Sequence, residues 1–193
     1  MQFEDLKKYH LILASKSPRR QYLLNELGLD FQVRTKEVDE SFPPNLKAQD
    51  IPLYLCRKKA DAFDEELNDN TIVITADTIV WIEDQVLNKP ENFDDAVRML
   101  QLLSGKMHEV YTGVCLKSKH KTKSFYALTQ VYFKTLSQQE IEFYINNFNP
   151  YDKAGAYGAQ EWIGYIAVEK IEGSYFNVMG LPVRELYEEL LRF

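Results

Sequence analysis

The segment TIVITADTIVWI, Thr71–Ile82, constrains this chain more than any other feature, because it is the most apolar and β-branched stretch of the sequence. Such a composition is typical of a strand buried on both faces, and it predicts one long strand or a tight pair of strands. Asp77 lies inside it, and a carboxylate there must be paired, bound to a metal or placed at a strand end. Two interpretations stay open. Asp77 is either a turn residue between two strands, or a metal ligand or general base at the carboxyl end of a strand.

The rest of the chain alternates between helical and strand patterns. Capping signals and apolar periodicity predict helices at residues 18–27, 51–67, 92–104 and 138–148 and at the C-terminus. Short apolar runs predict further strands at residues 11–14, 31–33, 110–117, 124–136 and 165–171. One long hairpin interrupts the alternation. This order predicts the α/β class, with a mixed sheet and flanking helices, and the 193 residues suit a single domain spanning residues 1–193.

Charge and composition exclude several function classes. The chain has 29 acidic and 23 basic residues, and a formal charge of −6 argues against nonspecific nucleic-acid binding. No apolar run approaches the roughly 18 residues of a membrane span, and the charged N-terminus lacks a signal peptide, so we expect a cytoplasmic protein. Cys56 and Cys115 form no CxxC pattern and are expected to be buried hydrophobes. Since the three histidines are scattered, any metal is expected to be a hard cation held by carboxylates.

The strand–loop–helix segment LILASKSPRR contains an unusual placement of charge. Ser17 suits the N-cap and Pro18 the first helical position, so Arg19 and Arg20 fall in the first turn. Cations there oppose the helix dipole at a cost of roughly 0.3–1 kcal/mol each, so we expect their removal to leave the fold stable. Together with Ser15 they would form an oxyanion cradle suited to phosphate, or they are two solvated arginines. The segment lacks the glycines of a Walker A loop.

Other polar residues are weak candidates taken singly. Glu40 lies in a polar loop, Lys59 on the predicted helix 51–67, and Lys89 before a proline that stiffens its loop. The loop 152–164 is rich in small residues that permit close approach of a ligand, and it carries Gln160. Each is ordinarily a surface residue. Considered together, an acidic cluster, several cations and one amide fit a ligand made of metal, polyphosphate and base.

Nine short motifs follow one another in a characteristic order. They are LASKSPRR (13–20), VDE (38–40), KA (59–60), ADT (76–78), NKP (88–90), SG (104–105), H-x-V-x-TG (108–113), DKAGAYGAQ (152–160) and N-x-x-GLP (177–182). The chain thereby resembles the Maf family of nucleoside triphosphate pyrophosphatases over nearly its whole length. Within the family it resembles the branch acting on dTTP and UTP, which has Arg, Thr and Gln at the specificity positions, here Arg19, Thr78 and Gln160. The branch that prefers 7-methyl-GTP has Trp, Gln and Glu there.

The resemblance implies an inosine-triphosphatase-like fold with two lobes around a central cleft, and hydrolysis of a nucleoside triphosphate to a monophosphate and pyrophosphate. It implies that Glu40 and Asp77 hold Mg²⁺ or Mn²⁺, and that Asp77 is also the proton acceptor. The residues implied to neutralise the triphosphate and the departing pyrophosphate are Lys59, Lys89, Arg19, Arg20 and Ser15. The biological role implied is sanitation of the nucleotide pool, and family analogy suggests a homodimer.

Two other functions stay open. The family takes its name from inhibition of septum formation, so the protein could be a nucleotide-binding regulator of cell division without significant turnover. Retention of Asp77, Lys59 and Lys89 together argues against that, because a sensor does not need the base. A nucleotidyltransferase or phosphotransferase is the third hypothesis, and it predicts different products.

Overall fold

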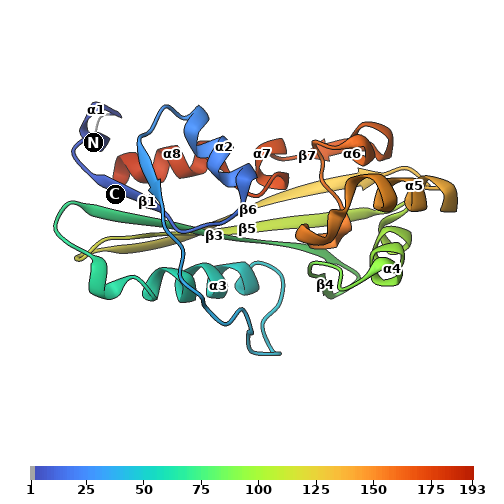
Figure 1. Cartoon of the computed structure of the whole chain (residues 1–193), viewed down its shortest axis with the longest axis horizontal. Helices are drawn as coiled ribbons and strands as arrows, with labels where there is room; N and C mark the ends of the chain where they lie inside the picture. Colours follow the sequence, from blue (N-terminus) through green and yellow to red (C-terminus); the bar gives the residue numbers. More distant parts are fainter. Residues whose placement is uncertain (1–2) are drawn as a thin grey trace. The chain divides into compact units, whose positions relative to one another are not determined.

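The computed structural model describes residues 3–193, which form a seven-stranded mixed sheet with flanking helices (Figure 1). The strand order is β2-β1-β3-β5-β6-β7, and β4 pairs with β3 off this path. Pairing is parallel between β1 and β2 and between β1 and β3, and antiparallel in the β3–β4 and β6–β7 pairs. The strands are β1 His10–Leu13, β2 Phe31–Val33, β3 Thr71–Ile82, β4 Gln85–Leu87, β5 Met107–Lys117, β6 Thr122–Phe133 and β7 Val168–Glu172. The predicted α/β class with a mixed sheet is confirmed.

The chain divides into two compact units. Unit 1 comprises the N-terminal part of the chain as far as Asp77, together with Thr112–Ala127 and Gly180–Phe193. Unit 2 comprises Thr78–Tyr111 and Leu128–Met179. The division falls within β3, β5 and β6, so each of these three strands contributes residues to both units. Among the described residues, no helix is both long and apolar enough to span a bilayer.

Unit 1 contains the helices α1 Phe3–Leu6, α2 Pro18–Glu26, α3 Asp50–Asp61 and α8 Val183–Arg192 and the 3₁₀ turn Asp64–Glu66. In Figure 1, α3 runs along one side of the strands of this unit, and α2 and α8 lie on the other side. The predicted start of α2 is confirmed, because the Ser17 side chain accepts a hydrogen bond from the Arg20 N–H and Pro18 is the first helical residue.

Helix α3 packs directly against β5. A Cβ atom at Gly113 would lie 2.5 Å from the Pro52 backbone, so only glycine allows this approach. The helix begins at Asp50 and ends at Asp61, so the predicted helix 51–67 is too long at its C-terminal end. Cys56 and Cys115 are buried without a disulfide, as the sequence predicts, and they pack with Ala60 in a small cluster.

Unit 2 contains the helices α4 Phe93–Leu103, α5 Gln138–Phe148, α6 Trp162–Ala167 and α7 Tyr175–Val178 and the 3₁₀ turns Pro150–Asp152 and Ala154–Ala156. The Asn92 side chain caps α4, and Ser137 with Glu140 forms a capping box at the start of α5. The apolar core of this unit gathers α4, α5 and α6 around residues such as Leu100 and Tyr144.

The predicted strand 165–171 is wrong in its first half. Residues Trp162–Ala167 form α6, and the strand β7 begins only at Val168. Ile163 and Ala167 are both completely buried, and their spacing of four places them on one face of a helix. Gly164 permits the turn, because a Cβ atom there would collide with the Ala159 carbonyl oxygen at 1.9 Å. The apolar residues of this stretch therefore follow a helical rather than an alternating period.

Candidate active site

Asp77 lies in the middle of β3. Strand β1 pairs with β3 at Thr71–Ile74 and β4 pairs with it at Val80–Ile82, so Asp77 falls in the stretch between these two pairings. Residues Thr71–Ile82 form one long strand, which confirms the prediction of a single strand rather than a tight pair. Both expected placements of Asp77, at a turn and at the carboxyl end of a strand, are wrong. The prediction that the carboxylate needs a partner is confirmed, since Lys59 Nζ lies 2.6 Å from its Oδ1 and Asp77 is only 9% exposed.

Lys59 joins two of the predicted site residues of unit 1. It belongs to the last turn of α3, where a cation also suits the negative end of the helix dipole. Its ammonium nitrogen lies 2.6 Å from the Asp77 carboxylate and 2.9 Å from Oε1 of Glu40, in the loop before α3. The Lys59 and Asp77 side chains are 16% and 12% exposed, whereas that of Glu40 is 56% exposed. Two carboxylates, one enclosed and one open to solvent, therefore converge on one cation.

This donor set fits a hard divalent cation in its chemistry. Carboxylate oxygens are the ligands that Mg²⁺ and Mn²⁺ prefer, and Mg²⁺ is commonly held by one or two carboxylates together with substrate phosphates and water. Glu40 and Asp77 already converge on a position occupied by positive charge, the ammonium of Lys59. Residues 3–193 contain no cluster of three or more His, Cys, Asp or Glu side chains that could bind a metal ion by itself. The residues fit a cation that arrives with its phosphate ligands.

Arg20 plays a structural part that the sequence did not reveal. Its Nε donates to the Gly180 carbonyl at 2.7 Å, and its Nη1 donates to the Ala76 carbonyl at 2.8 Å and to Ser15 Oγ at 3.4 Å. Ala76 belongs to the stretch of β3 between its pairings with β1 and β4, so a guanidinium takes the place of a neighbouring strand as the donor to this carbonyl. Burial lowers the pKa of Arg20, and the charge of Asp77 opposes that shift.

These contacts change one expectation for the cradle. Buried carbonyl partners compensate the charge of Arg20, so its loss should weaken the fold rather than leave it stable. Ser15 is buried, and its hydroxyl accepts from the Ser17 N–H at 3.3 Å as well as from Arg20. Arg19, the neighbouring residue, is half-buried. The structure thus brings Ser15, Arg20 and the residue before Asp77 together within unit 1.

The other predicted site residues, Thr78, Lys89 and Gln160, belong to unit 2. Lys89 is exposed in the loop after β4, while Thr78 and Gln160 are half-buried. The Lys89 loop contacts the loop that leads to Gln160, since the Gly155 N–H donates to the Asn88 carbonyl at 3.1 Å. Gly155 has a φ of +68°, and a Cβ atom there would lie 2.9 Å from the Val80 side chain, so this close approach requires glycine.

A polar network that the sequence did not predict supports the Gln160 loop. Lys153 is 7% exposed, and its ammonium lies 2.6 Å from Asp152 and 3.0 Å from Glu161. The Tyr144 hydroxyl donates to Glu161 Oε2 and accepts from the Gly158 N–H at 3.0 Å. Burial and the neighbouring Glu161 raise the pKa of Tyr144, so the phenol stays neutral. In the sequence, this network is indicated only by Tyr144, an aromatic residue on the inner face of α5, and by the KAG motif that begins at Lys153. Neither pattern shows which residues the side chains would contact.

Tyr157, an aromatic residue of the loop that leads to Gln160, belongs to the core. It is 5% exposed, and its hydroxyl lies 2.8 Å from Nε2 of His108. Phe133 meets both rings edge-on. Desolvation lowers the pKa of His108 to about 3, so this histidine is neutral in the folded protein near pH 7. Trp162, at the start of α6, packs against Phe143 with ring centroids 4.8 Å apart.

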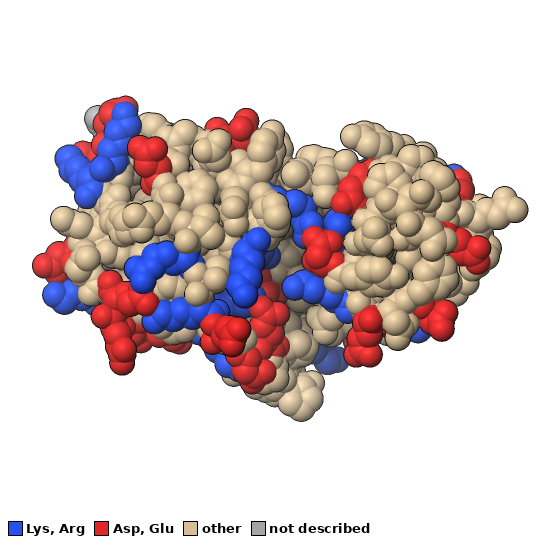
Figure 2. All heavy atoms as spheres, in the orientation of Figure 1, with Lys and Arg blue, Asp and Glu red and all other residues tan. Residues whose placement is uncertain are grey.

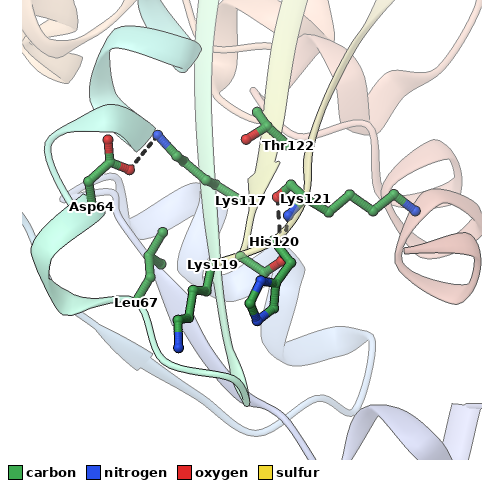
Figure 3. A pocket seen from close by; sticks show the side chains of 8 residues that line it. Asp64, Leu67, Lys117, Lys119, His120, Lys121 and Thr122 are labelled. Carbon is green, nitrogen blue, oxygen red and sulfur yellow. Dashed lines mark hydrogen bonds and ion pairs between the residues drawn. The ribbon is translucent and has the colours of Figure 1, made fainter.

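The face of the molecule drawn in Figure 2 shows little segregation of charge. On the face drawn in Figure 2, basic side chains are interspersed with acidic ones. Unit 1 also has an open cavity of about 460 Å³ at the turn between β5 and β6 (Figure 3). It is lined by Asp64, Leu67, Lys117, Ser118, Lys119, His120, Lys121 and Thr122.

Three of the basic side chains that line this cavity lie against acidic residues, namely Lys117, Lys119 and His120. In Figure 3, Lys117 points toward Asp64, with which it forms an ion pair. Lys119 and His120 lie 3.0 and 3.1 Å from Asp69. None of the predicted site residues lines the cavity, so the Lys59 cluster, defined as Lys59, Asp77 and Glu40, is the stronger candidate for catalysis.

Comparison with known proteins places the chain in a family. A family model described as Maf-like protein matches residues 10–193 of the chain. The chain belongs to the Maf family. A protein of Bacteroides thetaiotaomicron named dTTP/UTP pyrophosphatase is 53% identical, over 96% of this chain and 97% of its own. Proteins with the same name from Flavobacterium johnsoniae and Porphyromonas gingivalis are 52% and 47% identical, and each alignment covers at least 96% of both chains.

A solved structure supports the expected fold. The Staphylococcus aureus Ham1 protein superposes with a TM-score of 0.55 at 14% identity, over 95% of this chain and 98% of that one. This likeness concerns the fold alone. The predicted membership of the Maf family and the predicted inosine-triphosphatase-like fold are both confirmed.

Proposed function

We propose that the protein hydrolyses dTTP and UTP, and modified pyrimidine nucleotides related to them, to the monophosphate and pyrophosphate. The observation that carries the proposal is the Lys59 cluster, in which an enclosed carboxylate and a solvent-exposed one meet a single ammonium group. The names of the relatives support the substrates, as do Arg19, Thr78 and Gln160 at the positions predicted to set specificity.

In this proposal Asp77 is the proton acceptor. A water oxygen forms a bond to the α-phosphorus while the bond from that phosphorus to the bridging oxygen breaks, and the water proton passes to the Asp77 carboxylate. Pyrophosphate leaves with the bridging oxygen. The ammonium of Lys59, 2.6 Å from its Oδ1, holds the Asp77 carboxylate in position for this step. A divalent cation held by Glu40 and Asp77 would supply Lewis-acid stabilisation of the phosphate charge.

The cationic residues stabilise the leaving group in this scheme. When nucleotide binds, Lys59 exchanges part of its contact with the exposed Glu40 for phosphate oxygen, because Glu40 is readily solvated. Lys89, Arg19 and Ser15 provide further contacts to the triphosphate. Arg20 adds positive charge next to Ser15 and holds the backbone before Asp77 through the Ala76 carbonyl.

Gln160 is proposed to read the base. Uracil and thymine present an N3–H donor beside the O4 acceptor, and one carboxamide can accept from the first and donate to the second. Since nucleoside triphosphates are cytoplasmic metabolites, we place the reaction in the cytoplasm, as a sanitation step for the nucleotide pool. Pairing of two copies and the lack of nucleic-acid binding remain predictions from the sequence.

The test is a turnover panel with the purified protein. Canonical and modified triphosphates are incubated with Mg²⁺ or Mn²⁺, and monophosphate and pyrophosphate are quantified. We expect equal amounts of the two products, with dTTP and UTP among the best substrates. Tight binding without pyrophosphate release would favour the nucleotide-binding regulator of division. Products other than monophosphate and pyrophosphate would favour a transferase.

A further inference from the structure

Thr75 carries a buried hydroxyl in an otherwise apolar part of β3. Its neighbours along the strand are Val73, Ile74 and Ala76, and Thr75 itself is completely buried. The hydroxyl donates to the carbonyl oxygen of Cys56 on α3, at 2.6 Å. Valine has the same branched shape and would avoid the cost of burying a hydroxyl. The presence of threonine therefore points to a use for this hydrogen bond.

The Cys56 carbonyl does not depend on this donor. Cys56 lies within α3, which spans Asp50–Asp61, so its carbonyl faces the N–H of Ala60 in the regular pattern of an α-helix. A carbonyl oxygen has two lone pairs and can accept from the hydroxyl as well. The Thr75 hydroxyl is thus a second donor to a carbonyl that the helix already satisfies. What the bond adds is a fixed link between α3 and β3.

This link lies beside the Lys59 cluster. Lys59 belongs to the turn of α3 between Cys56 and Ala60, and Asp77 follows Thr75 by two positions, on the same face of β3. The ammonium of Lys59 lies 2.6 Å from Oδ1 of Asp77. The two elements that carry this ion pair are therefore the two that the hydroxyl joins.

This part of β3 has few other restraints. Strand β1 pairs with β3 only as far as Ile74, and β4 pairs with it only from Val80, so neither strand pairs with β3 at Thr75 or Asp77. Threonine is branched at Cβ and stiff about χ1, which limits the directions of its hydroxyl. A stiff side chain with a short hydrogen bond is suited to set the spacing between α3 and β3.

We infer that Thr75 is a positioning residue of the proposed reaction, which holds the turn of α3 that carries Lys59 at the distance from β3 that Asp77 requires. The inference rests on the proposed function, in which Asp77 accepts the proton of the attacking water. The Lys59 side chain is only 16% exposed, so it has little freedom to compensate for a shift of the helix. A displacement of about 1 Å in a reacting group can cost on the order of 10²-fold in rate.

The test separates the hydroxyl of Thr75 from its bulk. Thr75→Val keeps the branched shape and removes the donor, and we expect it to lower kcat for dTTP by about tenfold or more at saturating Mg²⁺. Thr75→Ser keeps the donor and should retain kcat to within about threefold. Because it lacks a buried methyl group, Thr75→Ser should also unfold at a temperature about 2–4 °C lower. The less stable variant is thus expected to be the more active one, which a merely structural role for Thr75 would not produce.

The matched control is Thr71→Val, at the first residue of β3 and on the same face of the strand. Thr71 is 1% exposed, and its hydroxyl donates to Oδ1 of Asn68 at 2.9 Å, so this variant also removes a buried hydroxyl and its hydrogen bond. We expect Thr71→Val to keep the kcat of the wild type.

Two results would overturn the inference. One is a kcat of Thr75→Val equal to that of the wild type, and the other is a loss of kcat in Thr75→Ser as large as in Thr75→Val. If Thr75→Val does not fold, Thr75→Ala replaces it, because alanine differs from serine only by the hydroxyl. Equal kcat of Thr75→Ala and Thr75→Ser would then overturn the inference.

Crystal structures of the wild type and Thr75→Val separate the inference from the proposed function. We expect the distance from Lys59 Nζ to Asp77 Oδ1, 2.6 Å in the wild type, to exceed about 3.2 Å in the variant. If the pair separates in this way but the wild type releases no pyrophosphate, the proposed function fails while the positioning role of Thr75 stands. If the wild type is active and the variant keeps both the distance and kcat, the inference fails while the proposed function stands.

Discussion

In unit 1 a cation lies between two carboxylates, whereas in unit 2 a carboxylate lies between a cation and a phenol. The Lys59 cluster has an open side, because the side chain of Glu40 is more than half exposed. The Lys153–Glu161–Tyr144 network is closed, with a nearly buried lysine and a hydrogen bond to the Gly158 backbone. An open cluster can exchange a partner for a substrate group, whereas a closed one holds a loop in a single shape. In the proposed function, the open cluster of unit 1 provides the proton acceptor Asp77, and the closed network of unit 2 supports the loop that carries Gln160.

The largest effect that tests this comparison is expected for Asp77→Asn. The amide nearly matches the carboxylate in shape but loses the basicity for water and the charge for metal, so turnover should fall on the order of 10²–10⁴-fold. The free energy of unfolding should change little, because the amide can still contact Lys59. Pyrophosphate release at saturating metal, together with thermal unfolding, measures both quantities. Activity within a factor of ten of the wild type would show that Asp77 serves only the fold.

Arg20→Ala tests the limits of this comparison, because Arg20 is a charged residue of unit 1 whose hydrogen bonds serve the fold. The substitution leaves the Ala76 and Gly180 carbonyls without their donor, and hydrogen bonds to a charged group are worth about 1.5–3 kcal/mol each. We expect the free energy of unfolding to fall by at least about 2 kcal/mol in urea titrations without nucleotide. Arg19→Ala is the matched control and should cost less than about 1 kcal/mol. Equal stability of the two variants would restore the view that both arginines serve phosphate alone.

The smallest effect concerns acid stability and is expected from His108 in unit 2. Burial holds the pKa of His108 at about 3 in the folded protein, well below its ordinary value of 6.5. Between about pH 6.5 and pH 3, His108 therefore binds a proton in the unfolded chain but not in the folded protein. The contribution of His108 is complete above pH 6.5 and is lost as the pH falls from 6.5 toward 3, at no more than about 1.4 kcal/mol per pH unit.

Urea titrations of His108→Gln between pH 7 and pH 5 would check this expectation. Glutamine can still bond the Tyr157 hydroxyl but does not titrate, so stability should fall less steeply with acid by roughly 1–2 kcal/mol over this interval. The control is His120→Gln, at an exposed side chain on the β5–β6 turn, and it should keep the wild-type slope. If His108→Gln also keeps the wild-type slope, then the buried His108 makes no contribution to the loss of protein stability in acid.

Much of the local structure could be predicted from the sequence. The caps at Ser17, Asn92 and Ser137 depend on hydrogen bonds between residues three positions apart, and all three are present. The long strand β3 follows from its β-branched composition, and the spaced motifs identify the family. Where the apolar period was ambiguous, as in Trp162–Ala167, the type of element was predicted wrongly.

The sequence by itself determined that Asp77 needs a partner, because an unpaired carboxylate in such an apolar segment would be too costly. Only the tertiary structure decided that the partner is Lys59, 18 positions away, and that Arg20 reaches the carbonyls of Ala76 and Gly180. The same holds for Glu161, whose partners come from α5 and from the loop around Lys153. Capping hydrogen bonds join residues within one turn, so the local sequence is enough to predict them. Bonds between distant segments depend on how strands and helices pack, which no local pattern specifies.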